Sequence, residues 1–352
     1  MPVPQVALVS DDLTGALDAA APFVAVGKHC VVATEPAALP AALAAGAEVV
    51  AVSLNSREGT AEEAARRVHE AAGTLAGVPL LFKKIDSRMK GHVACEVREL
   101  ALARGMRRVV LCPAIPEFGR LVEAGQVIGH GLAEPLPVAV DCGAGIAVAV
   151  ADARTDADLD RIVAQGGDAL LAGARGLAAA LARKVTGADG PKLAASRLEP
   201  PCTFVIGSQD PITLEQVARL RQALPAAVWI PAPDGMARVT GPLTDVVILQ
   251  AVPGTGAEGA TVAARLAESV ARDFVNGRRT LLFTGGETAA ACLRAMGVGV
   301  LKLVGEVHPG MPISLALDFP GALHIVTKSG GFGHPDCLAN LLRDPCNERI
   351  GS

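Results

Sequence analysis

Short apolar runs that stop abruptly at polar residues recur along this chain. The first, Val6–Val9, ends at Ser10, and two consecutive carboxylates, Asp11 and Asp12, follow before a segment rich in Ala and Leu. Runs of this length, bounded by polar or glycine-rich turns, are typical of buried strands. The same pattern predicts further strands at 30–33, 48–54, 79–85, 108–112, 146–151, 170–173, 202–206, 246–252, 280–283 and 324–327.

Segments with helical spacing lie between many of the predicted strands. Residues 60–74 carry apolar positions at this spacing, with Glu62 and Glu63 early, where acids complement the helix dipole. Other helices are predicted at 93–103, from 156, after 176 and over 258–275. Strands that alternate with helices in this way predict an α/β fold, with largely parallel sheets and helices on both faces.

A turn-rich stretch, Thr186–Pro201, divides the pattern into two halves. Its glycines and prolines favour a linker. We therefore expect two α/β domains, residues 1–195 and 200–352, with a ligand cleft between them.

The two halves end their predicted strands in different chemistry. In the first half the strand ends carry Asp, Ser, Lys and Arg, and in the second they carry Gly, Ser and Thr. Carboxylates and cations suit a small polyhydroxylated acid, whereas the bare amides of glycine turns suit phosphates. The pattern indicates two ligand sites, as a group-transfer reaction requires.

Composition and charge exclude several classes of function. The net charge is −4, and one Trp, eight Phe and no Tyr leave little aromatic surface on which nucleic-acid bases could stack. The eight cysteines form no CxxC pair, which indicates reduced thiols rather than a disulfide frame or a zinc site. No apolar stretch is long enough to span a membrane and no signal peptide is visible, so we expect a cytoplasmic protein.

Three loops carry candidate chemistry. Lys83–Gly91, KKIDSRMKG, is either a charged surface loop or an anion site in which Lys84 with Arg88 or Lys90 holds an anion and Asp86 binds a hydroxyl. Two glycine turns, TGGET at 284–288 and KSGGFG at 328–333, are candidate phosphate cradles. In the second, the lysine would pair with phosphate charge. The first could equally be a tight strand-to-helix turn.

One loop matches the glycine pattern of dinucleotide-binding motifs. Gly254–Gly259 reads GxGxxG, but no acidic residue ends the next strand at the required distance, so a nicotinamide site is disfavoured. Neither a P-loop nor the HExxH or GxSxG patterns occur.

Taken in order, these segments resemble the four-carbon acid sugar kinases, formerly a family of unknown function. The family pattern ADDLTGA matches Ser10–Ala16, KxDSTLRGNxGxE matches Lys84–Glu96, and PAxPxxGR matches Pro113–Arg120. Further family patterns match at Asp152–Leu159, Gly207–Gln216, Gly285–Thr288, Pro309–Pro312 and Lys328–Gly333. The order and spacing hold over nearly the whole chain.

The resemblance implies an N-terminal domain for an acid sugar and a C-terminal domain for ATP. The implied reaction is ATP-dependent phosphorylation of a terminal hydroxyl of a tetronate, a 3-oxo-tetronate or a related branched acid. ATP and Mg²⁺ are the implied cofactors and a small acid the partner, with no nucleic acid or membrane. A homodimer is left open.

The resemblance and the positions at strand ends suggest roles for individual residues. Asp12 is the expected proton acceptor, with Asp86 as a second catalytic carboxylate, and Asp86 and Arg120 are the expected partners of the Asp11–Asp12 pair. Asp11 and Asp86 would bind hydroxyls or magnesium, and no metal ligand set is assigned. The expected substrate-binding residues are Asp11, Lys84, Ser87, Arg88, Lys90 and Arg120. The expected ATP-binding residues are Ser208, Gly285, Gly286, Glu287, Thr288, Gly330, Gly331 and Gly333.

The chain departs from the family pattern mainly on the substrate side. Where the family has Thr and Arg, this chain has Arg88 and Lys90, and the residue after Arg120 is Leu121 in place of a Thr. In the second half, Asp210 replaces a Ser. These departures support an alternative, a sensor that binds acid sugar or nucleotide and has lost catalysis. A dehydrogenase using the GxGxxG loop is a third reading, and it predicts NAD(P) binding.

Overall fold

The computed structural model describes residues 3–187, 197–239 and 241–342, and the chain divides into two compact units. The first unit comprises residues up to Leu193 together with Gly299–Leu303, and the second comprises the rest. The division falls within the predicted linker, most of which lies outside the described residues. The sheet strands of each unit are mainly parallel, so the predicted α/β class is confirmed.

The first unit has a sheet whose strand order is β2-β3-β1-β4-β10-β5-β9, with every neighbouring pair parallel. The start of β15 (Val300–His308) adds to this sheet antiparallel to β2, with Val300 opposite Ala33. The pattern of apolar runs predicts the parallel strands but not this added one. The parallel strands are β1 (Val6–Ser10), β2 (Cys30–Ala33), β3 (Val49–Ser53), β4 (Leu80–Lys84), β5 (Arg108–Cys112), β9 (Ala147–Val150) and β10 (Leu170–Gly173).

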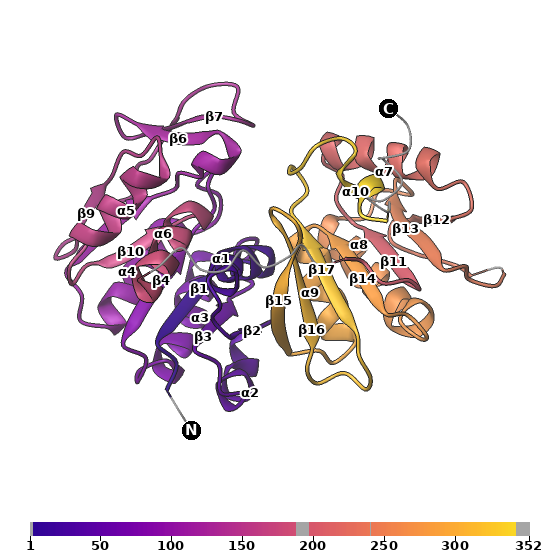
Figure 1. Cartoon of the computed structure of the whole chain (residues 1–352), viewed down its shortest axis with the longest axis horizontal. Helices are drawn as coiled ribbons and strands as arrows, with labels where there is room; N and C mark the ends of the chain where they lie inside the picture. The colour runs from indigo at the N-terminus through magenta and orange to yellow at the C-terminus, as the bar shows by residue number, and fades with distance from the viewer. Residues whose placement is uncertain (1–2, 188–196, 240, 343–352) are drawn as a thin grey trace. The chain divides into compact units, whose positions relative to one another are not determined.

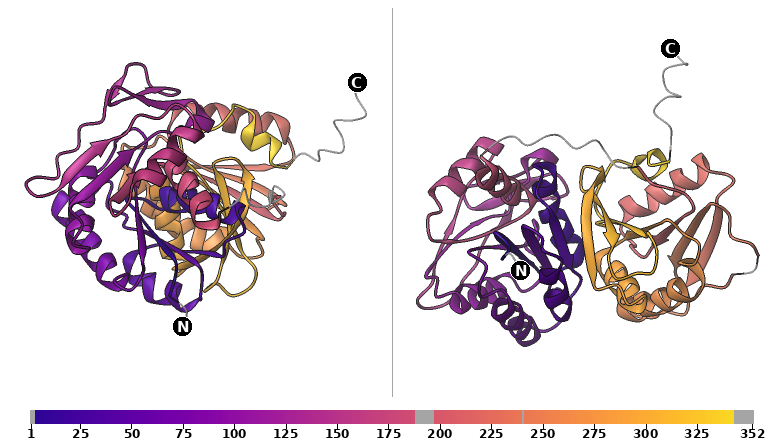
Figure 2. Two further views of the ribbon diagram at one scale, coloured as in Figure 1. Left: turned by 60° about the vertical axis from the view of Figure 1, so that its left-hand side comes forward. Right: turned by 60° about the horizontal axis from the view of Figure 1, so that its bottom comes forward.

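Helices cover both faces of this sheet. Helices α1 and α5 pack against α6, while α3 packs against α4 (Figures 1 and 2). Right-handed crossovers give this division, because the chain winds from β1 toward β2 on one face and from β3 through β4 to β5 on the other. The helices are α1 (Leu13–Ala25), α2 (Leu39–Ala44), α3 (Ala61–Thr74), α4 (Val93–Ala103), α5 (Asp156–Gln165) and α6 (Arg175–Thr186), with short 3₁₀ turns η1 (Pro36–Ala38) and η2 (Pro116–Phe118).

A small antiparallel sheet follows β5 and is absent from the sequence-based prediction. Its strands are β6 (Arg120–Glu123), β7 (Gln126–Gly129) and β8 (Leu136–Pro137). The β6–β7 turn has positive φ at Ala124 (48°) and Gly125 (71°), as a tight hairpin requires. The carboxylate of Asp152 accepts both turn amides, at 2.7 and 3.0 Å.

The second unit has the strand order β12-β13-β11-β14-β17-β16, in which only β16 runs antiparallel to its neighbour. Helix α8 packs against α9, and α7 packs against α10. The elements are β11 (Cys202–Ile206), α7 (Pro211–Ala223), β12 (Val228–Pro233), β13 (Val246–Val252), α8 (Gly259–Ser269), the π-helical turn η3 (Val270–Phe274), β14 (Thr280–Thr284), α9 (Gly286–Ala295), β16 (Met311–Ala316), β17 (His324–Lys328) and α10 (Cys337–Asn340).

The structure also bears on the expectations about membrane-spanning segments and cysteines. No helix within the described ranges is long and apolar enough to cross a membrane. The seven cysteines in those ranges are all free thiols, and six of them are buried, whereas Cys95 is partly exposed. The eighth, Cys346, lies outside the described residues.

Candidate functional site

The carboxyl ends of three adjacent strands bring the predicted substrate residues of the first unit together. Ser10 at the end of β1 is level with Ser53 of β3 on one side and with Lys84 of β4 on the other. The connection after β1 leads to β2 on one side, and the connection after β3 leads past β1 to β4 on the other side. This edge is therefore a topological switch point of the sheet. Ligands of open α/β sheets bind at such points.

Asp12 begins helix α1 and is its N-cap. Its Oδ1 accepts the amide of Gly15 at 2.8 Å, and its Oδ2 accepts the Thr14 hydroxyl at 2.5 Å. A Cβ added at Gly15 would lie 2.5 Å from Asp12 Oδ1, 2.6 Å from Ser10 Oγ and 3.2 Å from Lys84 Nζ. Only glycine fits at this position, because three polar side chains converge on it.

Arg57 is the cation that holds the carboxylates together. Its Nε lies 2.6 Å from Asp11 Oδ2, its Nη1 3.1 Å from Asp12 Oδ2, and its Nη2 3.7 Å from Asp86 Oδ2. A guanidinium suits this task because its planar fork presents several donors in fixed directions. The sequence-based site omitted Arg57, although it follows the end of β3 in a polar turn of the kind used to select the other residues.

The expectation that Arg120 would be the cationic partner of Asp11 and Asp12 is wrong. Arg120 donates to the Ser87 hydroxyl and, at 2.8 and 3.2 Å, to the carbonyl oxygen of His130. Within the described ranges it forms no ion pair with either aspartate. The reason is topological, since β3 is a direct neighbour of β1 and delivers Arg57 to the aspartates, whereas Arg120 begins the small separate sheet.

The two adjacent aspartates have opposite electrostatic environments. Burial raises the pKa of Asp12, and this effect exceeds the opposing attraction of Arg57. Burial acts on Asp11 too, but the positive charges of Arg57, Lys83 and Lys84 outweigh it and lower its pKa. The same carboxylates raise the pKa of Arg57, despite its burial. Pairs of carboxyl groups whose pKa values are driven apart are typical of acid–base sites.

Exposure separates the two aspartates as well. The Asp11 side chain is 3% exposed and that of Asp12 13%. Asp11 Oδ1 and the adjacent Ser10 Oγ are buried and have no hydrogen-bond partner among the described residues. Unsatisfied buried oxygens cost free energy, and in native proteins they are concentrated where function demands them.

A fully buried ion pair lies beneath these carboxylates. Lys83 Nζ is 2.8 Å from Glu96 Oε2, and both side chains are at most 1% exposed. Lys83 also donates to the carbonyl oxygens of Val9 and Lys84, at 3.3 and 2.7 Å. Glu96 accepts the hydroxyl of Ser56, whose amide donates to the Asp11 carbonyl at 2.9 Å. The pair therefore ties β1, β4, α4 and the Arg57 turn to one another.

The loop after β4 is shaped by Asp86. Asp86 Oδ1 accepts the amides of Arg88 at 2.8 Å and Lys90 at 3.4 Å, and Met89 has a positive φ of 58°. A Cβ added at Gly91 would lie 3.2 Å from Asp11 Oδ2, so the loop closes directly on the carboxylates. The loop side chains differ in exposure, with Ser87 buried, Arg88 half-buried and Lys90 exposed.

In the second unit, three glycine-containing turns meet at the carboxyl ends of β11, β14 and β17. Thr284 is level with Ile206 on one side and Lys328 on the other. The structure brings together most of the predicted ATP residues here. A Cβ added at Gly330 would collide with Ser208 Oγ, and one at Gly207 would collide with Thr288 Oγ1. Gly285 has a φ of 93° and opens helix α9, whose first amides face this edge.

Lys328 departs from the expectation that it pairs with phosphate charge, since its ammonium group is already engaged within the chain. It is fully buried and donates to the carbonyl oxygens of Ser329 and Gly330, at 2.9 and 3.1 Å, and to Thr213 Oγ1 at 3.4 Å. Burial lowers its pKa to about 8. Thr213 Oγ1 donates to the same Gly330 carbonyl at 2.7 Å, so these side chains fix the turn.

The GxGxxG loop is filled by a side chain of its own unit. The amides of Thr255 and Ala257 donate to the carboxylate of Asp234, at 2.6 and 3.3 Å, and the Thr255 hydroxyl donates to it at 2.8 Å. A Cβ added at Gly254 would lie 2.6 Å from that carboxylate. The amides that a pyrophosphate would need are therefore already bonded to Asp234. This agrees with the sequence argument against a nicotinamide site in this loop.

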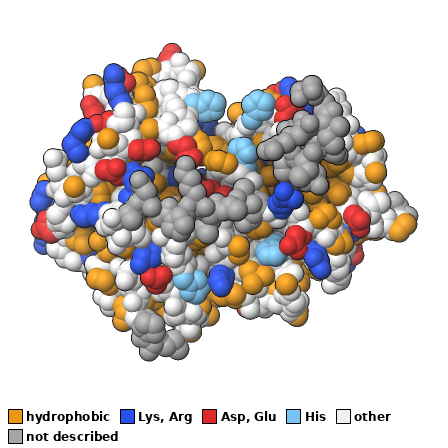
Figure 3. All heavy atoms as spheres, in the orientation of Figure 1, with side chains coloured by type: hydrophobic (Ala, Val, Ile, Leu, Met, Phe, Trp, Pro, Cys, Tyr) orange, Lys and Arg blue, Asp and Glu red, His pale blue; other side chains and the backbone are white. Residues whose placement is uncertain are grey.

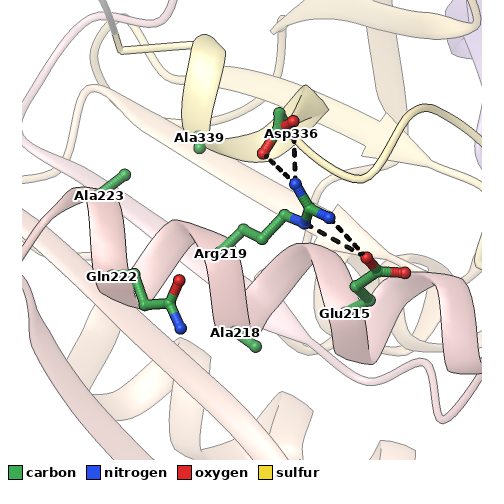
Figure 4. A pocket seen from close by; sticks show the side chains of 7 residues that line it. All are labelled: Glu215, Ala218, Arg219, Gln222, Ala223, Asp336 and Ala339. Carbon is green, nitrogen blue, oxygen red and sulfur yellow. Dashed lines mark hydrogen bonds and ion pairs between the residues drawn. The ribbon is translucent and has the colours of Figure 1, made fainter.

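A further hollow lies on the surface of the second unit. A hollow of about 550 Å³ lies between α7 and α10, where Arg219 bridges Glu215 and Asp336 at 2.9 and 3.0 Å (Figure 4). The one cation of this hollow is therefore already paired with both carboxylates. On the face drawn in Figure 3, acidic and basic side chains are interspersed rather than gathered into a basic patch. In the described part of the chain, no group of three or more His, Cys, Asp or Glu side chains could hold a metal ion.

Comparisons with known proteins match two parts of the chain, which include the first site and the Gly285 and Gly330 turns of the second. Residues 6–141 match a family model described as a sugar-binding N-terminal domain, and residues 236–338 match one described as a nucleotide-binding C-terminal domain. A D-threonate kinase of Bordetella bronchiseptica is 32% identical over 95% of this chain and 96% of its own length. A 3-oxo-tetronate kinase of Cupriavidus necator is 27% identical over 97% of each chain.

Solved structures share the fold. A Salmonella typhimurium protein, 21% identical, matches 96% of this chain and 98% of its own with a TM-score of 0.69. A Haemophilus influenzae protein, 18% identical, matches 94% and 97% with a TM-score of 0.66. At these identities the likeness concerns the fold alone.

Proposed function

Because this chain belongs to the four-carbon acid sugar kinase family, we propose that it transfers the γ-phosphoryl group of ATP to a terminal hydroxyl of a tetronate-type acid. The chain is a carbohydrate kinase at the level of its family. The acid is bound by the first unit and ATP by the second, which is the division that the two matched domains favour.

The observation that carries this proposal is the environment of Asp12. It lies at a strand end beside Lys84 and Arg57, its pKa is raised, and its side chain is the more exposed of the adjacent pair. In phosphoryl transfer the protein mainly has to align the reactants, neutralise charge and provide an acceptor for the hydroxyl proton. Asp12 is the acceptor in our proposal, because a carboxylate with a raised pKa takes up a proton more readily.

The neighbouring groups orient Asp12 and the substrate. Asp11 stays ionised and buried, so we assign it to holding Arg57 rather than to direct contact with substrate. Asp86 binds a substrate hydroxyl with its outer oxygen while its inner oxygen fixes the loop. Lys84, Ser87, Arg88, Lys90 and Arg120 supply the cations and hydroxyl that hold the acid.

In this proposal Mg²⁺ binds together with ATP, as the Mg²⁺–ATP complex. Asp11, Asp12 and Asp86 surround Arg57, so a cation already occupies the position between them. These residues therefore do not fit a resident metal ion. Mg²⁺ in kinases is held largely by the phosphates and water, with few protein ligands. The amides around Gly285, Gly330 and Gly333 receive the phosphates of the Mg²⁺–ATP complex.

A coupled assay of ADP release tests the proposal. We expect ATP consumption to depend on an added acid within a panel of threonates, erythronates, 3-oxo-tetronates and branched relatives. Acid binding and ATP binding in calorimetry without any acid-dependent ATP consumption would contradict the kinase and favour the sensor. Binding of NAD(P) would favour the dehydrogenase.

Two further expectations remain predictions. A cytoplasmic location follows from the use of ATP as donor. A homodimer is testable by the solution mass of the purified chain.

A further inference from the structure

The site of the first unit holds more positive than negative charge. Apart from the internally neutral Lys83–Glu96 pair, its carboxylates are Asp11, Asp12 and Asp86, and all three are gathered on Arg57. Its remaining cations are Lys84, Arg88, Lys90 and Arg120, which form no ion pair with any carboxylate in the described ranges. An excess of this kind calls for an anionic ligand.

Two of these cations lie next to each other at one side of the site. Arg120 bonds to the hydroxyl of Ser87, the residue that precedes Arg88. Burial and the positive charge of Arg88 lower the pKa of Arg120, opposed by Asp86. The backbone of Arg88 is fixed by its bond to Asp86 Oδ1, and the residue is partly buried. Asp86 offsets the repulsion between the two guanidinium groups only in part, because it also lies 3.7 Å from Arg57, so the arrangement is costly unless a ligand adds negative charge.

The position of the loop guanidinium, at residue 88, is a particular feature of this chain. The family pattern has Thr and Arg where this chain has Arg88 and Lys90, so the loop carries one positive charge more. One guanidinium binds one carboxylate in a bidentate manner, and a second can bind a second anionic group in the same way.

We propose that Arg88 and Arg120 form a subsite for a second anionic group, so that the substrate of this chain is a hydroxylated dicarboxylic acid with a free hydroxymethyl group. This inference rests on the proposed function and extends its substrate class from the monocarboxylic tetronates to a dicarboxylic relative. Arg120 and Arg88 each hold one carboxylate, Lys84 stays beside Asp12 at the reacting hydroxyl, and Lys90 lies at the exposed rim of the loop.

The test compares acids that differ in charge. The probes are threonate, hydroxymethylmalate, which has two carboxylates and a hydroxymethyl group, and 2-phosphoglycerate, whose second anion is a phosphate. We expect wild-type kcat/KM to be at least about tenfold higher on hydroxymethylmalate than on threonate, the size of one charge-assisted bonding pair. A preference for 2-phosphoglycerate over both would overturn the dicarboxylate and assign the subsite to a phosphate.

Substitutions in the loop separate the subsite from general effects of charge. Arg88→Thr should lower kcat/KM on hydroxymethylmalate by about tenfold or more beyond any loss on threonate, whose single carboxylate is also held by Arg120. The double variant Arg88→Thr/Lys90→Arg rebuilds the family pattern and should prefer threonate. Arg107→Thr removes an exposed loop cation outside the site and should leave all values unchanged.

The outcomes distinguish this inference from the proposed function. Equal losses on both acids in Arg88→Thr would overturn the subsite, because Arg88 would then act on the phosphoryl group or on folding. Thermal unfolding of each variant identifies the latter. If no acid supports ATP consumption, calorimetry without ATP still tests the subsite, by comparing the affinity of the wild type and of Arg88→Thr for hydroxymethylmalate. Hydroxymethylmalate bound about tenfold more weakly by Arg88→Thr would retain the subsite, and unchanged binding would remove it.

Discussion

Asp11 and Asp12 are adjacent in the chain but are given different tasks by their surroundings. Asp12 caps α1 and has a raised pKa, while Asp11 is nearly inaccessible and stays ionised beside Arg57, Lys83 and Lys84. The sequence shows two equivalent carboxylates at a strand end. Only the packing around them distinguishes a proton acceptor from a supporting charge.

Asp12→Asn tests this assignment. Asn also caps helices well, so the fold should persist, while kcat should fall by about 10²–10⁴-fold because the proton acceptor is lost. In the wild type, kcat/KM should fall as the pH drops through the raised pKa of Asp12, and this acid limb should vanish in Asp12→Asn. Full turnover with an unchanged acid limb would remove Asp12 from the role.

The same substitution has a predictable effect on stability. A raised folded-state pKa means that the folded chain holds the Asp12 proton more tightly than the unfolded chain does. The resulting stabilisation is complete below the ordinary pKa and is lost as the pH rises through the raised one. Asp12→Asn should therefore be at least as stable as the wild type at neutral pH. Urea denaturation at several pH values measures this.

Arg57 should be essential for both structure and turnover. Arg57→Ala leaves three carboxylates close together, two of them largely buried, and should lower the free energy of unfolding by roughly 3 kcal/mol. Arg66→Ala, which removes an exposed arginine on α3, should change it by less than about 0.5 kcal/mol. Equal effects in urea denaturation would contradict the central place given to Arg57.

The Lys83–Glu96 pair should show strong coupling. Lys83→Met alone leaves a buried carboxylate unpaired and should cost about 3–5 kcal/mol, whereas Lys83→Met/Glu96→Leu should cost much less than the two single changes combined. A double-mutant cycle in urea measures the coupling energy. Strict additivity would show that the two side chains stabilise the fold independently.

Among the elements, most of the buried parallel strands and the edge strand β9 could be predicted, whereas the edge strand β12, the antiparallel strands β15 and β16 and the small sheet could not. The apolar runs of β1, β3 and β4 are continuous, and the polar residues after them mark the site. Strand β12 is an edge strand that contains Pro231 and Pro233, and residues of this kind argue against a strand. The hairpin of β6 and β7 has neither an apolar run nor an Asn-Gly turn.

Register is the information that the sequence pattern lacks. Arg57 and Asp11 are far apart in the chain, and their contact depends on β3 lying beside β1. Lys83 lies in the segment predicted to be a charged surface loop or an anion site, and its full burial is not predictable from residue type, because lysines are rarely fully buried. The sequence pattern likewise gives no sign that Arg120 begins a separate sheet.

The glycine turns of the second unit offer a matched pair of substitutions. Gly207→Ala would drive a methyl group into Thr288, whereas the added methyl in Gly259→Ala would meet nothing closer than 3.9 Å. Gly207→Ala should weaken ATP binding by about tenfold or more, and Gly259→Ala should leave it unchanged. Calorimetry with ATP measures both. A larger loss in Gly259→Ala would return the phosphate site to the GxGxxG loop.

Across the molecule, the two units repeat one design. Each has mainly parallel sheet strands with site residues at their carboxyl ends, charged in the first unit and glycine-rich in the second. The fold class and this difference in chemistry follow from the apolar runs and their endings. The assignment of Gly299–Leu303 to the first unit cannot be predicted in this way. It depends on an antiparallel pairing with β2, which no local sequence pattern indicates.

Phosphorus NMR of the reaction products tests the kinase most directly. The wild-type chain is incubated with ATP, Mg²⁺ and the acid most active in the ADP assay. We predict a new phosphate-ester signal, coupled to the protons of a hydroxymethyl carbon, that grows in step with ADP and is absent with Asp12→Asn. ADP accompanied only by inorganic phosphate, or ATP that remains intact with every acid bound by the chain, would contradict the account.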